Sequence, residues 1–278
     1  IFVQMMAWLP FLMAAIDDYV ATRRRRSLAL CALFTGLLLL SGAHSILHFA
    51  ALLLAAYAGA ALASSSLGQP RGQRLRFAFT VGGALLFAAL LGALLGAVAL
   101  APTLSAMPHT TRALGTDYKF ASSYAWPGLR YLQLLLLPDA MGIGENRQQP
   151  FLSPWNHWEL AGYYQGALAL LLALPGVGTL LRRRGPVDLE RIVLFGCAVA
   201  GVLIALGDAG PLHPILFRYL PLYAALRCPS RGLIMVVVAV PILAAYGAQR
   251  CLGSPAPQPP GTAAPRSRPS FTAWTRAA

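Results

Sequence analysis

Long apolar runs separated by short polar or basic stretches dominate the pattern of this chain. A helix needs about 20 mostly apolar residues to cross the hydrocarbon core of a bilayer. Segments that approach this length lie at residues 1–16, 27–43, 45–63, 77–101, 160–181, 192–207 and 232–249. The pattern therefore predicts an all-α fold, a polytopic transmembrane helical bundle with about seven spans.

The connections between these segments differ in length. The second and third segments nearly abut at Gly42, which predicts a tight helical hairpin. The connections at about 102–159 and 208–231 are long, and each contains an apolar stretch too short to span a bilayer, at 129–137 and 212–226. Such stretches are typical of short interfacial helices. We thus predict a transmembrane helical domain over residues 1–250 and a disordered tail, rich in Pro and Arg, over 251–278.

Composition supports the membrane prediction and excludes other classes. Only 11% of the residues are charged, against about 25% in soluble domains. The net charge of +13 would suit a nucleic-acid partner. The basic residues form no motif that reads nucleic acid, however, and the apolar runs point instead to the lipid bilayer as a partner.

The basic residues also predict an orientation. Fifteen of the 22 lysine and arginine residues fall in every second connection or in the tail, within 23–26, 71–76, 182–191 and 250–276. Cytoplasmic loops carry this excess. We therefore expect a multi-pass protein of the bacterial inner (cytoplasmic) membrane, with its C-terminus in the cytoplasm and both long connections outside.

Other sequence signals are weak. The chain begins at Ile1, and its first apolar stretch lacks the charged start and cleavage site of a signal peptide, so we expect an N-terminal part to be missing. The four cysteines show no CxxC spacing, which argues against a zinc site or a structural disulfide. No cofactor is identified, and nothing in the sequence supports a divalent metal.

Isolated polar residues gather in the long connections. Glu159 precedes a predicted span, where it could favour the positive end of the helix dipole or face a cavity; the sequence leaves both readings open. Arg227 and Arg231 flank a Cys-Pro-Ser turn and break the charge rule that the other arginines follow. Because arginine binds phosphate in a bidentate manner, we favour a lipid-linked phosphate as their partner over simple snorkelling to headgroups.

Histidines and aromatic residues accompany these charges. We interpret His44 and His48, one turn apart, as a satisfied polar contact between helices. The tyrosines and tryptophans of the first long connection, Trp126 and Tyr163 among them, are typical of an aromatic belt at the level of the lipid headgroups.

Several short motifs resemble those of the bacterial YfhO-type membrane proteins. The similar stretches are SGAH at 41–44, LPD at 137–139, WELAGYYQG at 158–166, GPLHP at 210–214, LPL at 220–222, LRCPSR at 226–231 and LAAYG at 243–247. The likeness covers most of residues 1–250. That family is in turn similar to the GT-C glycosyltransferases, which are multi-helix enzymes with an external active site.

The resemblance implies a function. It implies a membrane glycosyltransferase-like protein that uses a polyprenyl-phosphate-linked sugar to modify a cell-envelope acceptor. Arg227 and Arg231 would hold the donor phosphate. Glu159 with Tyr163 would line the cavity or order the loop, and Glu159 is also a candidate catalytic residue. His44 would belong to the same external face, and the remaining candidates for a base are Asp117 and Asp139.

One departure from the family pattern limits this inference. The family places a catalytic acid in its first external loop, which in this chain would precede Ile1. Asp17 and Asp18 do not replace it, since they are predicted to face the cytoplasm beside Arg23. A transporter or flippase for an amphiphilic solute, and a non-catalytic membrane scaffold, are the alternatives. The near absence of charge within the spans counts against ion-coupled transport.

Overall fold

The computed structural model describes residues 2–42, 44–110, 117–126, 128–136, 163–181, 188–220, 223–225 and 228–252. Every regular element among them is helical. The all-α prediction is thus confirmed for this part of the chain. The tail after residue 252, for which we predict disorder, lies outside the described residues.

Eight helices of ten or more residues make up most of the structure. They are α1 (Phe2–Thr22), α2 (Arg25–Leu40), α3 (His44–Leu67), α4 (Arg74–Leu95), α5 (Ala97–Ala106), α8 (Ala167–Leu181), α9 (Leu189–Ala205) and α11 (Ile234–Cys251). Shorter helices are η1 (Arg71–Gln73), η2 (Met107–His109), α6 (Tyr118–Ala121), η3 (Leu129–Leu135), η4 (Gly207–Ala209), α10 (Leu212–Tyr219), η5 (Tyr223–Ala225) and η6 (Pro229–Leu233). The short helices expected at 129–137 and 212–226 are therefore present where those segments are described.

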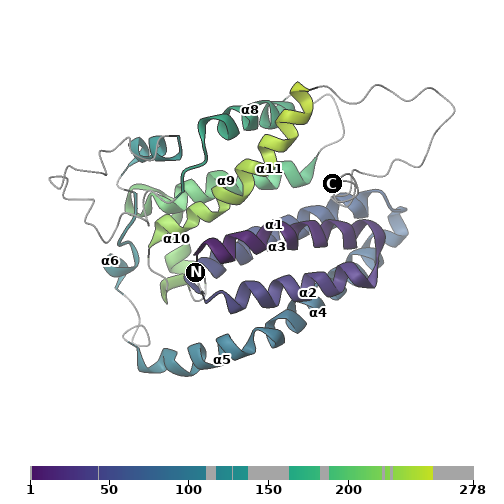
Figure 1. Cartoon of the computed structure of the whole chain (residues 1–278), viewed down its shortest axis with the longest axis horizontal. Coiled ribbons are helices and arrows are strands. Elements are labelled where there is room, and N and C mark those ends of the chain that lie inside the picture. The colour runs from purple at the N-terminus through teal and green to yellow at the C-terminus, as the bar shows by residue number, and fades with distance from the viewer. Residues whose placement is uncertain are drawn as a thin grey trace.

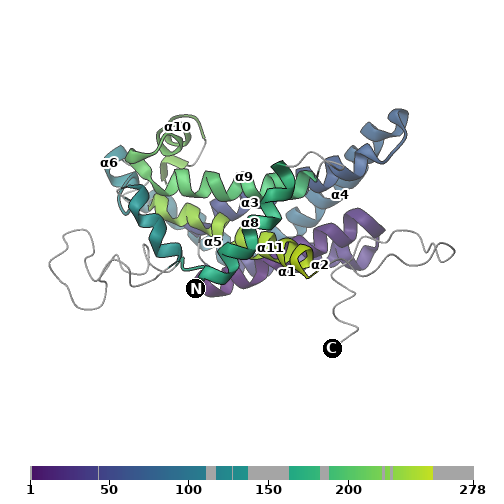
Figure 2. The same ribbon diagram turned by 90° about the horizontal axis from the view of Figure 1, so that it is seen from above.

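The long helices lie side by side along the long axis of the molecule (Figure 1). Helices α1 to α4 form one group, α8, α9 and α11 form another, and α3 packs against α9 between them (Figures 1 and 2). Helices α6 and α10 lie at one end, which we call the α10 end. The opposite end carries Arg23–Arg26 and the three arginines of residues 71–76, and we call it the arginine end.

Three helical segments are long and apolar enough to cross a membrane: Ile46–Leu67, Arg71–Leu95 and Pro229–Cys251. Helices α2 and α9 have 16 and 17 residues, so each rises only about 25 Å. That is less than the roughly 30 Å of a bilayer core. The helical, membrane-associated character of the chain is thus supported, whereas a total of seven spans goes beyond these three helices.

The three membrane-length helices differ in how deeply the protein buries them. Of the apolar stretch in each helix, the protein buries 61% in Pro229–Cys251, 39% in Ile46–Leu67 and 17% in Arg71–Leu95. Helix α11 is therefore central, and α4 lies at the edge. Large side chains of α4, such as Phe87 and Leu94, are mostly exposed. An exposed apolar face of this size is expected where lipid replaces protein as the neighbour.

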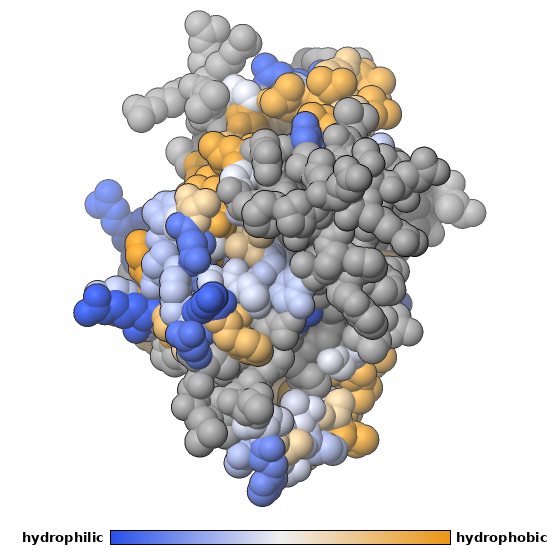
Figure 3. Space-filling model, turned by 90° about the vertical axis from the view of Figure 1, so that its left-hand side faces the viewer, coloured by the Kyte–Doolittle hydropathy of each residue, from blue (hydrophilic) through white to orange (hydrophobic). Residues whose placement is uncertain are grey.

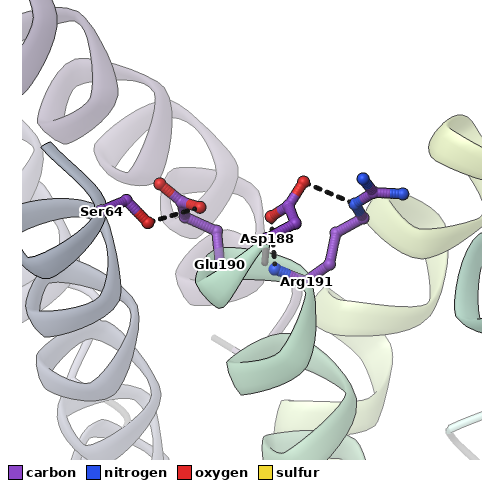
Figure 4. Close-up of polar contacts among 4 residues, drawn as sticks. All are labelled: Ser64, Asp188, Glu190 and Arg191. Carbon is purple, nitrogen blue, oxygen red and sulfur yellow. Dashed lines mark hydrogen bonds and ion pairs between the residues drawn. The ribbon is translucent and has the colours of Figure 1, made fainter. Parts of the chain in front are cut away.

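Local chemistry explains several helix ends. Gly42 has a φ of 74°, a left-handed conformation that glycine adopts without steric cost, and it allows the tight turn between α2 and α3. Asp188 is the N-cap of α9, where its side chain accepts from the Arg191 backbone N–H at 3.1 Å. Its other carboxylate oxygen lies 2.6 Å from Arg191 Nε (Figure 4).

Hydrogen bonds connect helices near the arginine end. The Tyr57 hydroxyl donates to Asp17 Oδ2 at 2.6 Å and connects α3 to α1. The Ser64 hydroxyl donates to Glu190 Oε2 at 3.1 Å and connects α3 to α9 (Figure 4). Asp17 lies within α1, because this helix continues six residues beyond Ile16, where hydropathy predicted its end.

Candidate functional site

Four aromatic rings pack together at the α10 end. Tyr118 of α6 lies 5.5 Å from His213 and 5.0 Å from Phe217, both of α10, between ring centroids. His213 lies 5.5 Å from Tyr223 of η5. Rings at these distances attract one another, so the cluster fixes α6 and η5 against α10.

A buried hydrogen bond forms the centre of this cluster. His213 Nδ1 and the Tyr223 hydroxyl are 2.8 Å apart, and both residues are 2% exposed. If Tyr223 donates, the imidazole carries its proton on Nε2; if Nδ1 donates, Nε2 holds a lone pair. In either tautomer His213 Nε2 retains hydrogen-bonding capacity.

Burial of the cluster favours the neutral forms of its titratable side chains. Burial lowers the pKa of His213, and the negative charge of Asp208 opposes this effect only in part. Burial, together with a hydrogen bond to Asp208 and its charge, raises the pKa of Tyr118 to about 12. Burial also raises the pKa of Tyr223. At neutral pH the cluster thus presents a neutral imidazole and two neutral phenols.

Three buried polar atoms at this end have no hydrogen-bond partner among the described residues. They are His48 Nε2 of α3, His213 Nε2 of α10 and Ser230 Oγ of η6. The His48 ring contacts Tyr223 at 6.1 Å between centroids, and η6 packs against α3 and α9. An unsatisfied buried polar group costs about 1–3 kcal/mol, so three from different elements are unusual.

Backbone geometry positions the segments that carry these groups. The Trp126 backbone N–H donates to the Ala205 carbonyl at 2.6 Å. The Trp126 side chain is fully buried, and the two features anchor residues 117–126 beside the end of α9. Cys228, which precedes η6, has a φ of 67°. Non-glycine residues rarely adopt this conformation, and strain of this kind often accompanies functional sites.

The hydrophilic residues of this end are visible in Figure 3, which views the molecule from the side of α6 and α10. Hydrophilic side chains gather on the left of this view at about mid-height, and hydrophobic ones lie above them and at the lower right. Arg218, an exposed residue of α10, belongs to this end, and its guanidinium lies 5.6 Å from the Tyr219 ring centroid.

The residues predicted from the sequence are partly brought together. Arg231 is half-buried in η6, directly after Ser230. Asp117 is exposed and precedes α6 as its N-cap residue, without a side-chain cap bond. His44 is the first residue of α3, but its side chain lies outside what the structure describes. Three further candidates lie outside the described residues: Asp139, Glu159 and Arg227.

Two interpretations from the sequence need correction. Trp126 is 0% exposed and Tyr163 is 5% exposed, so these rings pack in the protein interior and not in a surface belt, because they fill space beside the ends of the long helices. His48 was expected to form a satisfied polar contact. Its Nε2 is instead buried without a hydrogen-bond partner among the described residues, because its neighbours are the rings of Phe49 and Tyr223.

Sequence reasoning missed the pairing of His213 with Tyr223 and of Tyr118 with Asp208. Both pairs join residues of different short elements, so no helical or strand spacing connects them. The available signal was composition alone: histidine, tyrosine and aspartate concentrated between 208 and 223 in an otherwise apolar region. Within the described residues, no group of three or more His, Cys, Asp and Glu side chains is arranged to hold a metal.

The state of His213 leads to a pH prediction. Because its pKa is lower in the folded protein than in the unfolded chain, the unfolded chain binds more protons as pH falls below about 6.5. The unfolding free energy should therefore decrease between pH 7.5 and pH 5. His213→Gln should show a smaller decrease, measured by thermal unfolding in detergent. The exposed His109 provides the control, and equal pH dependence in H213Q and H109Q would contradict the prediction.

In chemical terms, the α10 end offers buried hydrogen-bonding groups beside a half-buried arginine. These groups suit the oxygens of a phosphate or a sugar hydroxyl. Comparisons with protein-family models, with curated proteins and with solved structures found no match to this chain.

Proposed function

We propose that this chain is a membrane glycosyltransferase-like protein. Its α10 end would bind a polyprenyl-phosphate-linked sugar on the external face of the bacterial inner membrane and direct it to an envelope acceptor. The proposal combines the resemblance to YfhO-type proteins with the polar cluster at one end of a bundle that contains membrane-length helices.

One observation carries the proposal. His48 Nε2, His213 Nε2 and Ser230 Oγ are buried and lack partners among the described residues. A site prepared for a polar ligand explains why such costly groups are kept, because the ligand oxygens would satisfy them. A site that served only packing would be expected to use apolar side chains of similar size.

Each group would have a distinct role. Arg231, with Arg227 four positions earlier in the sequence, would supply the positive charge for the donor phosphate. His213 and Ser230 would hydrogen-bond the phosphate or the sugar. Of the candidate bases predicted from the sequence, Asp117 lies within the described residues, and it is next to Tyr118 of the aromatic cluster. A base must lie within hydrogen-bond reach of the acceptor hydroxyl.

Binding by the purified chain tests this function. A short-chain polyprenyl-phosphate hexose should bind, and the same polyprenol without phosphate should bind at least tenfold more weakly. The double variant R227A/R231A should lose this phosphate preference. Arg218→Ala removes an exposed arginine from the same end and should leave it unchanged.

Ser230→Ala separates a ligand-binding role from a structural one. Because the hydroxyl is unsatisfied in the protein alone, its loss should leave thermal stability unchanged or slightly higher. Affinity for the phosphorylated lipid should fall by about tenfold, as expected for one hydrogen bond to a charged group. Unchanged affinity in both S230A and R227A/R231A would refute the proposed site.

A flippase for an amphiphilic solute is the second candidate. The observation in its favour is the pair of carboxylates, Asp17 and Glu190, that accept hydrogen bonds from α3 near the arginine end. Movement of a fluorescent polyprenyl phosphate between leaflets of proteoliposomes, without sugar transfer, would favour this function. Binding with neither activity would favour a scaffold.

A further inference from the structure

Two groups of arginines meet at the arginine end. Residues 23–26 are all arginine, and Arg71, Arg74 and Arg76 follow α3. Arg23 joins the groups: its Nη1 donates to the Tyr19 carbonyl at 2.9 Å, and its guanidinium lies 4.4 Å from the centroid of Phe77 on α4. The turn between α1 and α2 is therefore held against the beginning of α4.

Two of the seven arginines have structural partners. Arg23 is held as described, and Arg74 donates to the carbonyls of Gln69 and Leu67 at 3.1 and 3.2 Å. The others are exposed, and none of them forms an ion pair with a described residue: Arg24, Arg25, Arg26, Arg71 and Arg76. The two acidic residues near the end of α1 both accept hydrogen bonds, Asp17 from Tyr57 and Asp18 from Ser27.

The first residues of α2 add further positive charge that a bound anion would offset. Arg24 is its N-cap and makes no side-chain cap bond, and Arg25 and Arg26 occupy the first turn. Cations at a helix N-terminus oppose the helix dipole, whereas a phosphate there is stabilised by the dipole and the free N–H groups. A bound anion would therefore offset both the dipole and the repulsion among the guanidinium groups.

An apolar stripe begins beside these charges. Leu75, Phe79, Leu86 and Leu90 of α4 are each more than 60% exposed and recur at spacings that place them on one helix face. From Leu75 to Leu90 the helix rises about 22 Å, which is comparable to an extended acyl chain. Exposed guanidinium groups at the beginning of an exposed apolar stripe match the two parts of a phospholipid.

We propose that the arginine end is a binding surface for anionic phospholipids. The guanidinium groups of both loops would bind the phosphodiester and its negative charge, and the α4 stripe would contact the acyl chains. A zwitterionic headgroup would bind more weakly, because its choline carries a compensating positive charge. This surface lies at the opposite end from the proposed sugar-lipid site (Figure 1) and does not depend on it.

Lipid titration of the purified chain tests this surface. Phosphatidylglycerol and phosphatidylcholine are added separately to the protein in detergent, and bound lipid is counted by native mass spectrometry. Phosphatidylglycerol should bind at least tenfold more tightly. Since each basic residue near a lipid surface contributes about fivefold, R25Q/R76Q should weaken phosphatidylglycerol binding by about thirtyfold, and R25K/R76K should retain most of it.

A double variant of equal charge provides the control. K119Q/R218Q removes two exposed basic residues of the α10 end, and it should leave phosphatidylglycerol affinity unchanged. Equal losses in R25Q/R76Q and K119Q/R218Q would overturn the proposal, because net charge alone would then govern binding. Displacement of phosphatidylglycerol by millimolar inorganic phosphate would also overturn it, since the surface would then recognise free phosphate and not a lipid.

Discussion

Replacing Gly247 by alanine is expected to force α8 away from α11 and to destabilise the bundle by about 3 kcal/mol, the upper part of the range for overpacking. A Cβ atom at Gly247 would lie 1.7 Å from the Leu172 carbonyl oxygen. Gly176, on the facing side, is similar, because its Cβ would lie 2.3 Å from the Leu243 oxygen. Both obstacles are backbone atoms, which cannot rotate away as a side chain can.

Gly178 is the matched control for this packing prediction. It lies on α8, two residues beyond Gly176, and an added Cβ there would meet nothing within 4 Å. Because alanine favours helix over glycine by up to about 1 kcal/mol, G178A should be as stable as the parent protein or more so. Thermal unfolding in detergent, followed by circular dichroism, compares G247A, G176A and G178A. Equal unfolding temperatures for all three would contradict the close packing of α8 and α11.

Hydropathy predicted the helices well because apolar length is a local property. Each of the seven expected segments overlaps a long helix of the described chain. The boundaries were harder to predict. Asp17 and Asp18 interrupt the apolar run but not α1, since Tyr57 and Ser27 provide hydrogen bonds to their carboxylates. The segment 77–101 is divided at Gly96, where α4 ends and α5 begins.

The site was harder to predict than the helices, because it depends on contacts between distant residues. His48 and Tyr223 are neighbours in the structure but 175 positions apart in the chain. No spacing rule connects them. Arg231 stood out because it departs from the charge pattern, which is a local signal. The burial of Ser230 gave no signal, since a serine in a Pro-Ser-Arg turn would ordinarily be solvated.

The two ends of the bundle are expected to lie on opposite sides of the membrane, with the α10 end outside. The arginine end carries seven arginines, which cytoplasmic loops favour, and the polar cluster lies at the other end. Cysteines at two positions can report which side of the membrane each end of the bundle faces. Cys251 is an exposed natural cysteine at the end of α11. Tyr219 of α10 is 71% exposed and can be replaced by cysteine. Cys31 and Cys228 are buried and should react slowly.

Labelling with a membrane-impermeant maleimide in spheroplasts, before and after permeabilisation, therefore tests the central claim most directly. Y219C in a C251S background should label in intact spheroplasts. Cys251 in the parent protein should label only after permeabilisation, and a cysteine at the exposed Gln73 should behave like Cys251. Labelling of Y219C and Cys251 from the same side would contradict a bundle whose α10 end lies outside and whose arginine end lies in the cytoplasm.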